Sequence, residues 1–158
     1  MRRPLLLALA IAAFACVAGA PSEARASGTA VTWTKIDVPD SDAAMEKQLK
    51  KLLDQAAKKA NFGKTKKLSF SVKMLEFTSE TKGDVHRVTC AIIGRIPGGP
   101  SAKSKISFGG SPADKAKLEK QILTMVSKAV VVRLAEIVRA RAAKEAEAKK
   151  EAEESGDG

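Results

Sequence analysis

The sequence predicts an α+β fold, a two-layer sandwich in which two helices pack on one face of a small antiparallel or mixed sheet. Four stretches rich in β-branched or alternating apolar residues predict strands, and two stretches with apolar residues at helical spacing predict helices. Their order along the chain is β-α-β-β-β-α. Because each helix has one apolar side, this order favours two layers with one face of the sheet left open.

The first 26 residues have the pattern of a secretory signal peptide. Two arginines precede an uncharged stretch from Leu5 to Val17, which is shorter than the ~20 apolar residues that a membrane-spanning helix needs. Residues Ala24 to Ala26 then match a signal-peptidase site, which predicts a periplasmic or secreted chain beginning at Ser27. Cys16 offers the alternative of an acylated N-terminus, which would anchor the protein to a membrane.

Residues 27–141 are long enough for one domain with one hydrophobic core, and no linker divides them. They carry 22 basic and 11 acidic residues, whereas residues 142–158 carry three basic and six acidic ones. A basic body favours anionic partners. The Ala-, Glu- and Lys-rich segment 142–158 has no apolar face, so we expect a solvated helix or a disordered tail there.

The first two predicted elements are a strand and an amphipathic helix. Residues 31–38 are β-branched and extended, and Pro39 ends the strand. Asp40 to Asp42 then provide helix-capping oxygens for a helix that runs to about Ala60. One side of this helix is apolar and the opposite side carries lysines, which predicts one buried and one solvated side.

The next three predicted strands form an antiparallel meander. They cover Lys67 to Phe77, Val85 to Ile96 and Ala102 to Phe108, with Pro- and Gly-rich turns between them. Apolar and polar residues alternate in each strand, so that one face of the sheet is expected to be dry. The alternation slips near Met74, because Leu75 and Phe77 are both apolar, and this slip indicates a β-bulge or a twist.

The last helix is predicted to begin at Ser111 and Pro112 and to run at least to Arg139. At 1.5 Å per residue it is ~40 Å long, more than a small sheet covers, and its apolar stripe drifts around the axis. Two interpretations stay open: the helix wraps around its own core, or its second half presents an apolar surface to a partner or a second copy. The residues of that expected interaction surface are Leu123, Val130, Val131, Leu134, Ile137 and Val138.

The open face of the sheet holds the clearest constellation of functional candidates. Of eleven positions predicted to face outward on the three-strand meander, five are cationic and none is acidic. The cations are Lys73, Arg87, Arg95, Lys103 and Lys105. Lysine and arginine on a rigid platform suit phosphate or carboxylate groups, although such residues also keep an exposed sheet soluble and guard its edges.

A search for catalytic and metal-binding motifs predicts no enzyme. His86 is the one histidine, and it lies ~13 Å along the same strand from Cys90, too far for proton transfer. Cys90 alternates onto the apolar side and is expected to be a buried free thiol. No motif for a nucleophilic serine, a phosphate loop or a calcium site is present, so we expect no catalytic residue, no metal and no cofactor.

An exported chain with this element order and a basic sheet face resembles small outer-membrane assembly lipoproteins, such as the plug proteins of lipopolysaccharide transport. The resemblance covers Val31 to about Val138 and consists of element order alone. It implies a partner barrel and an anionic lipid headgroup, with the five sheet cations as the contacting residues.

These observations predict an exported, non-enzymatic binding or adaptor protein of the bacterial cell envelope. Its expected partner is an envelope protein, an anionic envelope polymer or a lipid headgroup, bound through the basic sheet face. The alternatives are a structural homo-oligomer that associates through the last helix, and a small outer-membrane assembly lipoprotein if Cys16 is acylated. Nucleic acid is not expected, because the open face lacks aromatic residues for base stacking and the leader indicates export. Membrane contact is expected only with lipidation.

Overall fold

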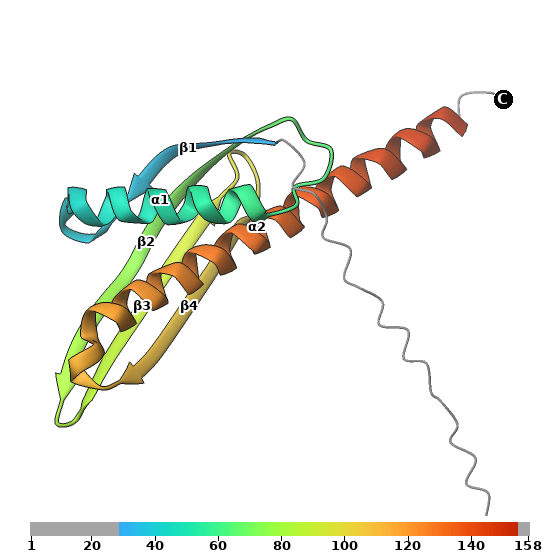
Figure 1. Ribbon diagram of the computed structural model, residues 1–158. Coiled ribbons are helices and arrows are strands. Elements are labelled where there is room, and N and C mark those ends of the chain that lie inside the picture. The colour runs from blue at the N-terminus through green and yellow to red at the C-terminus, as the bar shows by residue number, and fades with distance from the viewer. Residues whose placement is uncertain (1–28, 155–158) are drawn as a thin grey trace, which may run out of the picture.

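The computed structural model describes residues 29–154 and has the α+β fold that the sequence predicts, with two helices on one face of a small mixed sheet (Figure 1). The expected signal peptide, its cleavage before Ser27 and the alternative acylation of Cys16 lie outside the described residues. The elements are β1 (Ala30–Asp37), α1 (Ala43–Lys59), β2 (Lys67–Lys82), β3 (Val85–Arg95), β4 (Ser101–Gly110) and α2 (Lys115–Glu154), with short 3-10 turns at Pro39–Ser41 and Pro112–Asp114.

The four strands lie in the order β1-β2-β3-β4, so neighbours in the sheet are also neighbours along the chain. β1 and β2 are parallel, and α1 makes the crossover between them. The β2-β3-β4 part is the predicted antiparallel meander. Figure 1 shows α1 and α2 on the same side of the sheet, so the core lies between the two layers and the opposite sheet face is open.

The beginning of α1 is fixed by Asp42, whose carboxylate accepts hydrogen bonds from the backbone N–H groups of Ala44 and Met45 at 2.9 and 3.1 Å. Leu49 and Leu53 on the apolar side of the helix are fully buried. A second tie joins α1 to β1, because the Trp33 indole donates to the Asp54 carboxylate at 2.7 Å. The helix is therefore held both by its packing and by one polar contact.

β2 is longer than the sequence predicts. It continues to Lys82 and joins β3 through a two-residue turn in which Gly83 adopts a φ of 59°, a conformation that glycine tolerates best. The predicted irregularity is confirmed as a register shift between Met74 and Glu76, with Leu75 as the extra residue. Because one residue is inserted, the side chains after Leu75 switch faces relative to simple alternation.

The drift of the apolar stripe on α2 has a simple cause, because the helix packs on β3 and β4 and also against α1. This packing corrects the expected interaction surface. Five of its six residues are buried inside the chain and Ile137 is half-buried: Leu123, Val130, Val131, Leu134 and Val138 belong to the core. Of the two interpretations of this helix, the structure favours the one in which it wraps around its own core.

Beyond the sheet, α2 continues as a single helix to Glu154 (Figure 1). Its 40 residues correspond to ~60 Å. The side chains of residues 142–152 are exposed, as expected for a solvated helix. Among the described helices, none is both long and apolar enough to cross a membrane.

Candidate functional site

The open face of the sheet is not uniformly basic, which corrects the prediction that it holds no acidic side chain. The bulge at Leu75 moves Glu76, Thr78 and Glu80 onto this face, where the register pairs them with Ala91, Thr89 and Arg87 of β3. From β1, Lys35 and Asp37 lie beside Ser71 and Lys73. The open face therefore has two halves of different electrostatic character.

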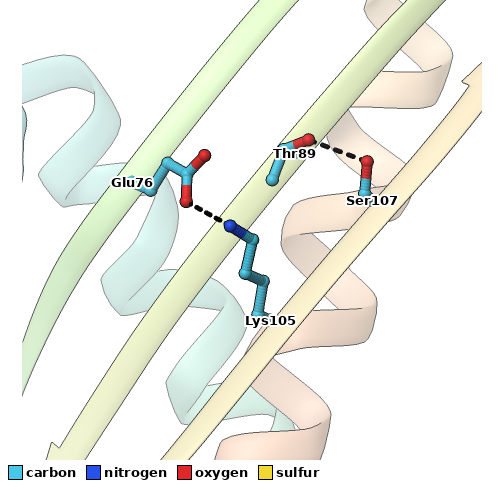
Figure 2. A network of polar contacts seen from close by, with 4 residues as sticks. All are labelled: Glu76, Thr89, Lys105 and Ser107. Atoms are coloured by element: carbon cyan, nitrogen blue, oxygen red, sulfur yellow. Dashed lines mark hydrogen bonds and ion pairs between the residues drawn. The ribbon is translucent and has the colours of Figure 1, made fainter.

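The half beyond the bulge is nearly charge-balanced, with Glu76 and Glu80 against Lys82, Arg87 and Lys105, and it is cross-linked. Lys105 of β4 reaches over β3 to Glu76 of β2, with 2.7 Å between Nζ and Oε2 (Figure 2). The register places the small side chain of Ala91 between them, which leaves room for this contact across two strands. One row further on, the Thr89 and Ser107 hydroxyls lie 2.8 Å apart. This half offers paired charges and satisfied hydroxyls to a partner.

Arg87 lies in the same balanced half. It is directly opposite Glu80, and both line a hollow of about 500 Å³ together with Glu76 and Lys82. Lys82 is itself 3.8 Å from Glu80. Two of the five predicted cations, Arg87 and Lys105, thus lie beside acidic side chains that were not predicted on this face.

The other half of the open face keeps an excess of positive charge. Its cationic cluster consists of Lys35, Lys73, Arg95 and Lys103, which come from all four strands. One acid accompanies them, because Asp37 is 3.0 Å from Lys35 Nζ. Lys73, Arg95 and Lys103 form no ion pair with any described residue.

Three of the four cations of the cluster line a hollow of about 190 Å³ on the sheet surface, and Lys103 lies beside it on β4. Lys35, Ser71, Lys73 and Arg95 line it together with Asp37. Neighbouring strands are ~4.8 Å apart, so cationic groups on adjacent strands lie within reach of one multivalent anion. Exposed ammonium and guanidinium groups beside a serine hydroxyl provide donors for phosphate or carboxylate oxygens.

A second polar constellation lies inside the sandwich, around His86. The imidazole is fully buried and bonds Ser79 through Nε2 at 3.0 Å and Thr81 through Nδ1 at 2.7 Å. The Ser79 hydroxyl donates to the Glu119 carboxylate at 2.5 Å, so in the neutral ring Nε2–H donates to Ser79 and Nδ1 accepts from Thr81. This chain ties the first turns of α2 to the β2–β3 hairpin and leaves the imidazole inaccessible to substrate.

Cys90 is buried on the helix side of β3, as the strand alternation predicts. Burial raises the pKa of its thiol to about 12, and the negative charge of Glu76 adds to the effect. A thiol with this pKa is protonated at neutral pH, whereas the nucleophilic form is the thiolate. No cluster of three metal-binding side chains occurs among the described residues.

Two signals for the open face were accessible in the sequence. The slip at Leu75 indicated a bulge, and the run Thr78 to Lys82 has the alternation of charged and hydroxyl residues that suits an exposed strand. The contribution of Lys35 and Asp37 had no such signal, because the position of β1 next to β2 depends on the crossover of α1.

Comparison with known proteins gives similarity to solved structures only. No model of a known protein family matches the sequence, and no curated protein matches it. A crystal structure of a proposed lipoprotein from Caulobacter crescentus CB15 shares 8% identity and a TM-score of 0.42, covering 68% of this chain and 90% of the other. A minor lipoprotein from Acinetobacter baumannii shares 15% identity and a TM-score of 0.31, covering 73% and 94%.

Proposed function

We propose that this protein is an exported, non-enzymatic binding or adaptor protein of the bacterial envelope, and that its cationic cluster contacts an anionic partner. The observation that carries the proposal is the split of the open face. Lys105 is ion-paired with Glu76, and Arg87 lies opposite Glu80. Among the described residues, Arg95 and Lys103 have no ion-pair partner, and Asp37 opposite Lys73 pairs with Lys35 instead.

A rigid sheet is a suitable platform for such contacts. Each cation of the cluster is anchored on a different strand of one hydrogen-bonded sheet, so the strand spacing sets how far apart the anchors lie. Little backbone ordering is then needed when an anion binds, which lowers the entropic cost of association. The shared chemistry of the partner is a row of phosphate or carboxylate groups, from an envelope polymer, a lipid headgroup or an acidic protein surface.

The experiment is a charge-removal series on the mature chain. Lys73, Arg95 and Lys103 are replaced together by glutamine, and binding is measured by calorimetry with inorganic polyphosphate and by co-sedimentation with phosphatidylglycerol vesicles. We expect affinity at low salt to fall about tenfold or more, because three contacts of ~0.5 kcal/mol each are lost. The salt dependence of the remaining binding should be weaker.

The matched control replaces Lys47, Lys50 and Lys51 by glutamine. These lysines are exposed on α1, away from the sheet, and their loss changes the net charge equally. A specific cationic cluster predicts that this control binds like the parent protein. Equal loss in both triple variants would overturn the proposal, because only the overall charge would then matter. If the cluster variant loses binding to polyphosphate alone, the partner is identified as a polymer. If it loses binding to vesicles alone, the partner is identified as a lipid headgroup.

The envelope location rests on the leader pattern of residues 1–26. Intact-mass analysis of the protein from its own cells tests it. An unmodified chain beginning at Ser27 supports a soluble periplasmic or secreted protein, whereas a lipid on Cys16 supports the membrane-anchored assembly lipoprotein. A chain that still begins at Met1 contradicts export.

A further inference from the structure

The free edge of β4 is the second surface that the described residues leave open. β4 ends the strand order, and it pairs with β3 over ten residues without a register shift. Arg133 of α2 donates to the backbone carbonyl of Lys103, which shows that this carbonyl points away from β3. Backbone groups alternate along an antiparallel strand, so the N–H and C=O groups of Lys105, Ser107 and Gly109 also point outward.

These outward backbone groups are available for pairing. In the described part of the chain, Lys105, Ser107 and Gly109 make no backbone hydrogen bond outside the sheet ladder. Arg133 binds the edge at the carbonyl of Lys103. An exposed regular edge of this kind is a template for an added strand, unless charges or bulges block it.

An apolar hollow of about 520 Å³ lies beside the same edge, between β4 and the first half of α2. Phe108 and Met125 line it with 60% and 50% of their surfaces exposed, and Leu118 and Ile122 lie beside them. Phe108 belongs to the helix side of β4, in register with the buried Val88. A strand added at the edge would place alternate side chains over this hollow.

The charges around the edge define the partner. Lys103 projects on the open-face side, whereas Lys105 reaches back over β3 and is paired with Glu76. Lys117 and Lys120 line the hollows on the helix side, where Asp114 is the accompanying acid. A second copy of this chain fits poorly, because a twofold pairing through the middle of β4 sets lysines opposite lysines. An extended segment with acidic residues on one face and apolar residues on the other fits the β4 edge. Its acidic face would lie on the open-face side of the sheet and its apolar face over the hollow on the helix side.

We propose that β4 binds an extended acidic peptide segment of a partner protein by strand addition, with the apolar side chains of the segment over Phe108 and Met125. This site goes beyond the cationic cluster, since it uses backbone groups and an apolar hollow and shares only Lys103 with the cluster. An experiment can therefore overturn strand addition at β4 without contradicting anion binding at the cationic cluster.

The test uses a fluorescent peptide of about eight alternating glutamate and valine residues, a typical strand length, and measures its anisotropy with the mature protein. Two derivatives of equal charge carry N-methyl groups on the glutamate amides or on the valine amides. In an added strand, the backbone amides of either the glutamates or the valines face β4, but not both. We therefore expect one derivative to bind about tenfold more weakly and the other to bind like the parent peptide. Equal binding of both derivatives overturns strand addition.

Protein variants test the apolar part separately. Phe108→Glu places a charge at the hollow and should weaken the parent peptide about tenfold, whereas Leu75→Glu changes an exposed apolar side chain on another strand and should not. Circular dichroism checks that both variants fold. Unchanged binding to Phe108→Glu overturns the site. A dimer of the parent protein in sedimentation, lost in Phe108→Glu, would assign the edge to a second copy instead.

Discussion

His86 and Cys90 lie on the same side of β3, yet their surroundings make them chemically very different. His86 sits in a chain of hydroxyl and carboxylate contacts that reaches Glu119 of α2. Cys90 is enclosed by apolar side chains of the core. Buried polar groups need hydrogen-bond partners, and the histidine finds them in Ser79 and Thr81. Through Ser79 and Glu119, this buried polar chain positions α2.

The raised pKa of Cys90 predicts an inert thiol. In a Cys16→Ser background at pH ~8, alkylation of the native protein should be at least about a hundredfold slower than after unfolding in urea, because the folded thiol stays protonated. The raised pKa also makes the free energy of unfolding depend on pH. The stabilisation from the neutral, buried thiol is fully present below the ordinary pKa of cysteine and is lost as the pH rises toward about 12.

The control for Cys90 moves the thiol to the open face. Thr78 is exposed on β2, so a Cys90→Ser, Thr78→Cys variant in the same background should react at an ordinary rate without urea. Mass spectrometry of the alkylated product gives both rates. Rapid alkylation of native Cys90 would contradict its burial.

Among the elements, α2 and β3 approach each other closely at Gly94. A Cβ atom there would lie 2.8 Å from Leu134 Cδ1 and 2.9 Å from Val130 Cγ1. Both neighbours are fully buried, so they have little room to move. The glycine is therefore required by packing, and not by its backbone conformation.

Gly94→Ala should lower the free energy of unfolding by ~1–3 kcal/mol, since the added methyl group overpacks the interface between α2 and β3. Urea denaturation followed by circular dichroism measures the change. Gly110→Ala is the matched control, because a Cβ at that position of β4 would lie 3.5 Å from Leu118, an ordinary contact. Similar destabilisation in both variants would contradict the close approach at Gly94.

The elements also show where sequence reasoning succeeds. The capping oxygen of Asp42, the alternation in β3 and the slip at Leu75 are local signals, and each predicted its element. The consequence of the slip depends on β2 continuing through Thr78 to Lys82, a polar run that its pairing with β3 holds in the sheet. Local signals alone therefore do not place Glu76 and Glu80 on the open face, because their position depends on this long-range pairing.

For the whole molecule, the two layers followed from element order, but the division between core and surface did not. Val130 and Leu134 lie outside the early stripe of α2, and both are buried where the helix approaches β3 at Gly94. That contact is long-range, so periodicity along α2 alone cannot reveal it. For this reason, the buried second half of the α2 stripe resembled a surface for a partner in the sequence.

The overall shape separates the sandwich from the helical extension, and this separation predicts independent behaviour. Arg139 and Arg141 still lie close to the body, near Gly63 and Gly99, whereas the side chains of residues 142–152 are exposed. A chain that ends after Arg141 should keep its urea midpoint and shift its Tm by less than ~2 °C, because no buried apolar surface is removed. Its ellipticity at 222 nm should fall with the loss of helix. A clear drop in the urea midpoint would instead mean that the extension stabilises the sandwich, which its exposed, Ala-, Glu- and Lys-rich surface gives no physical means of doing.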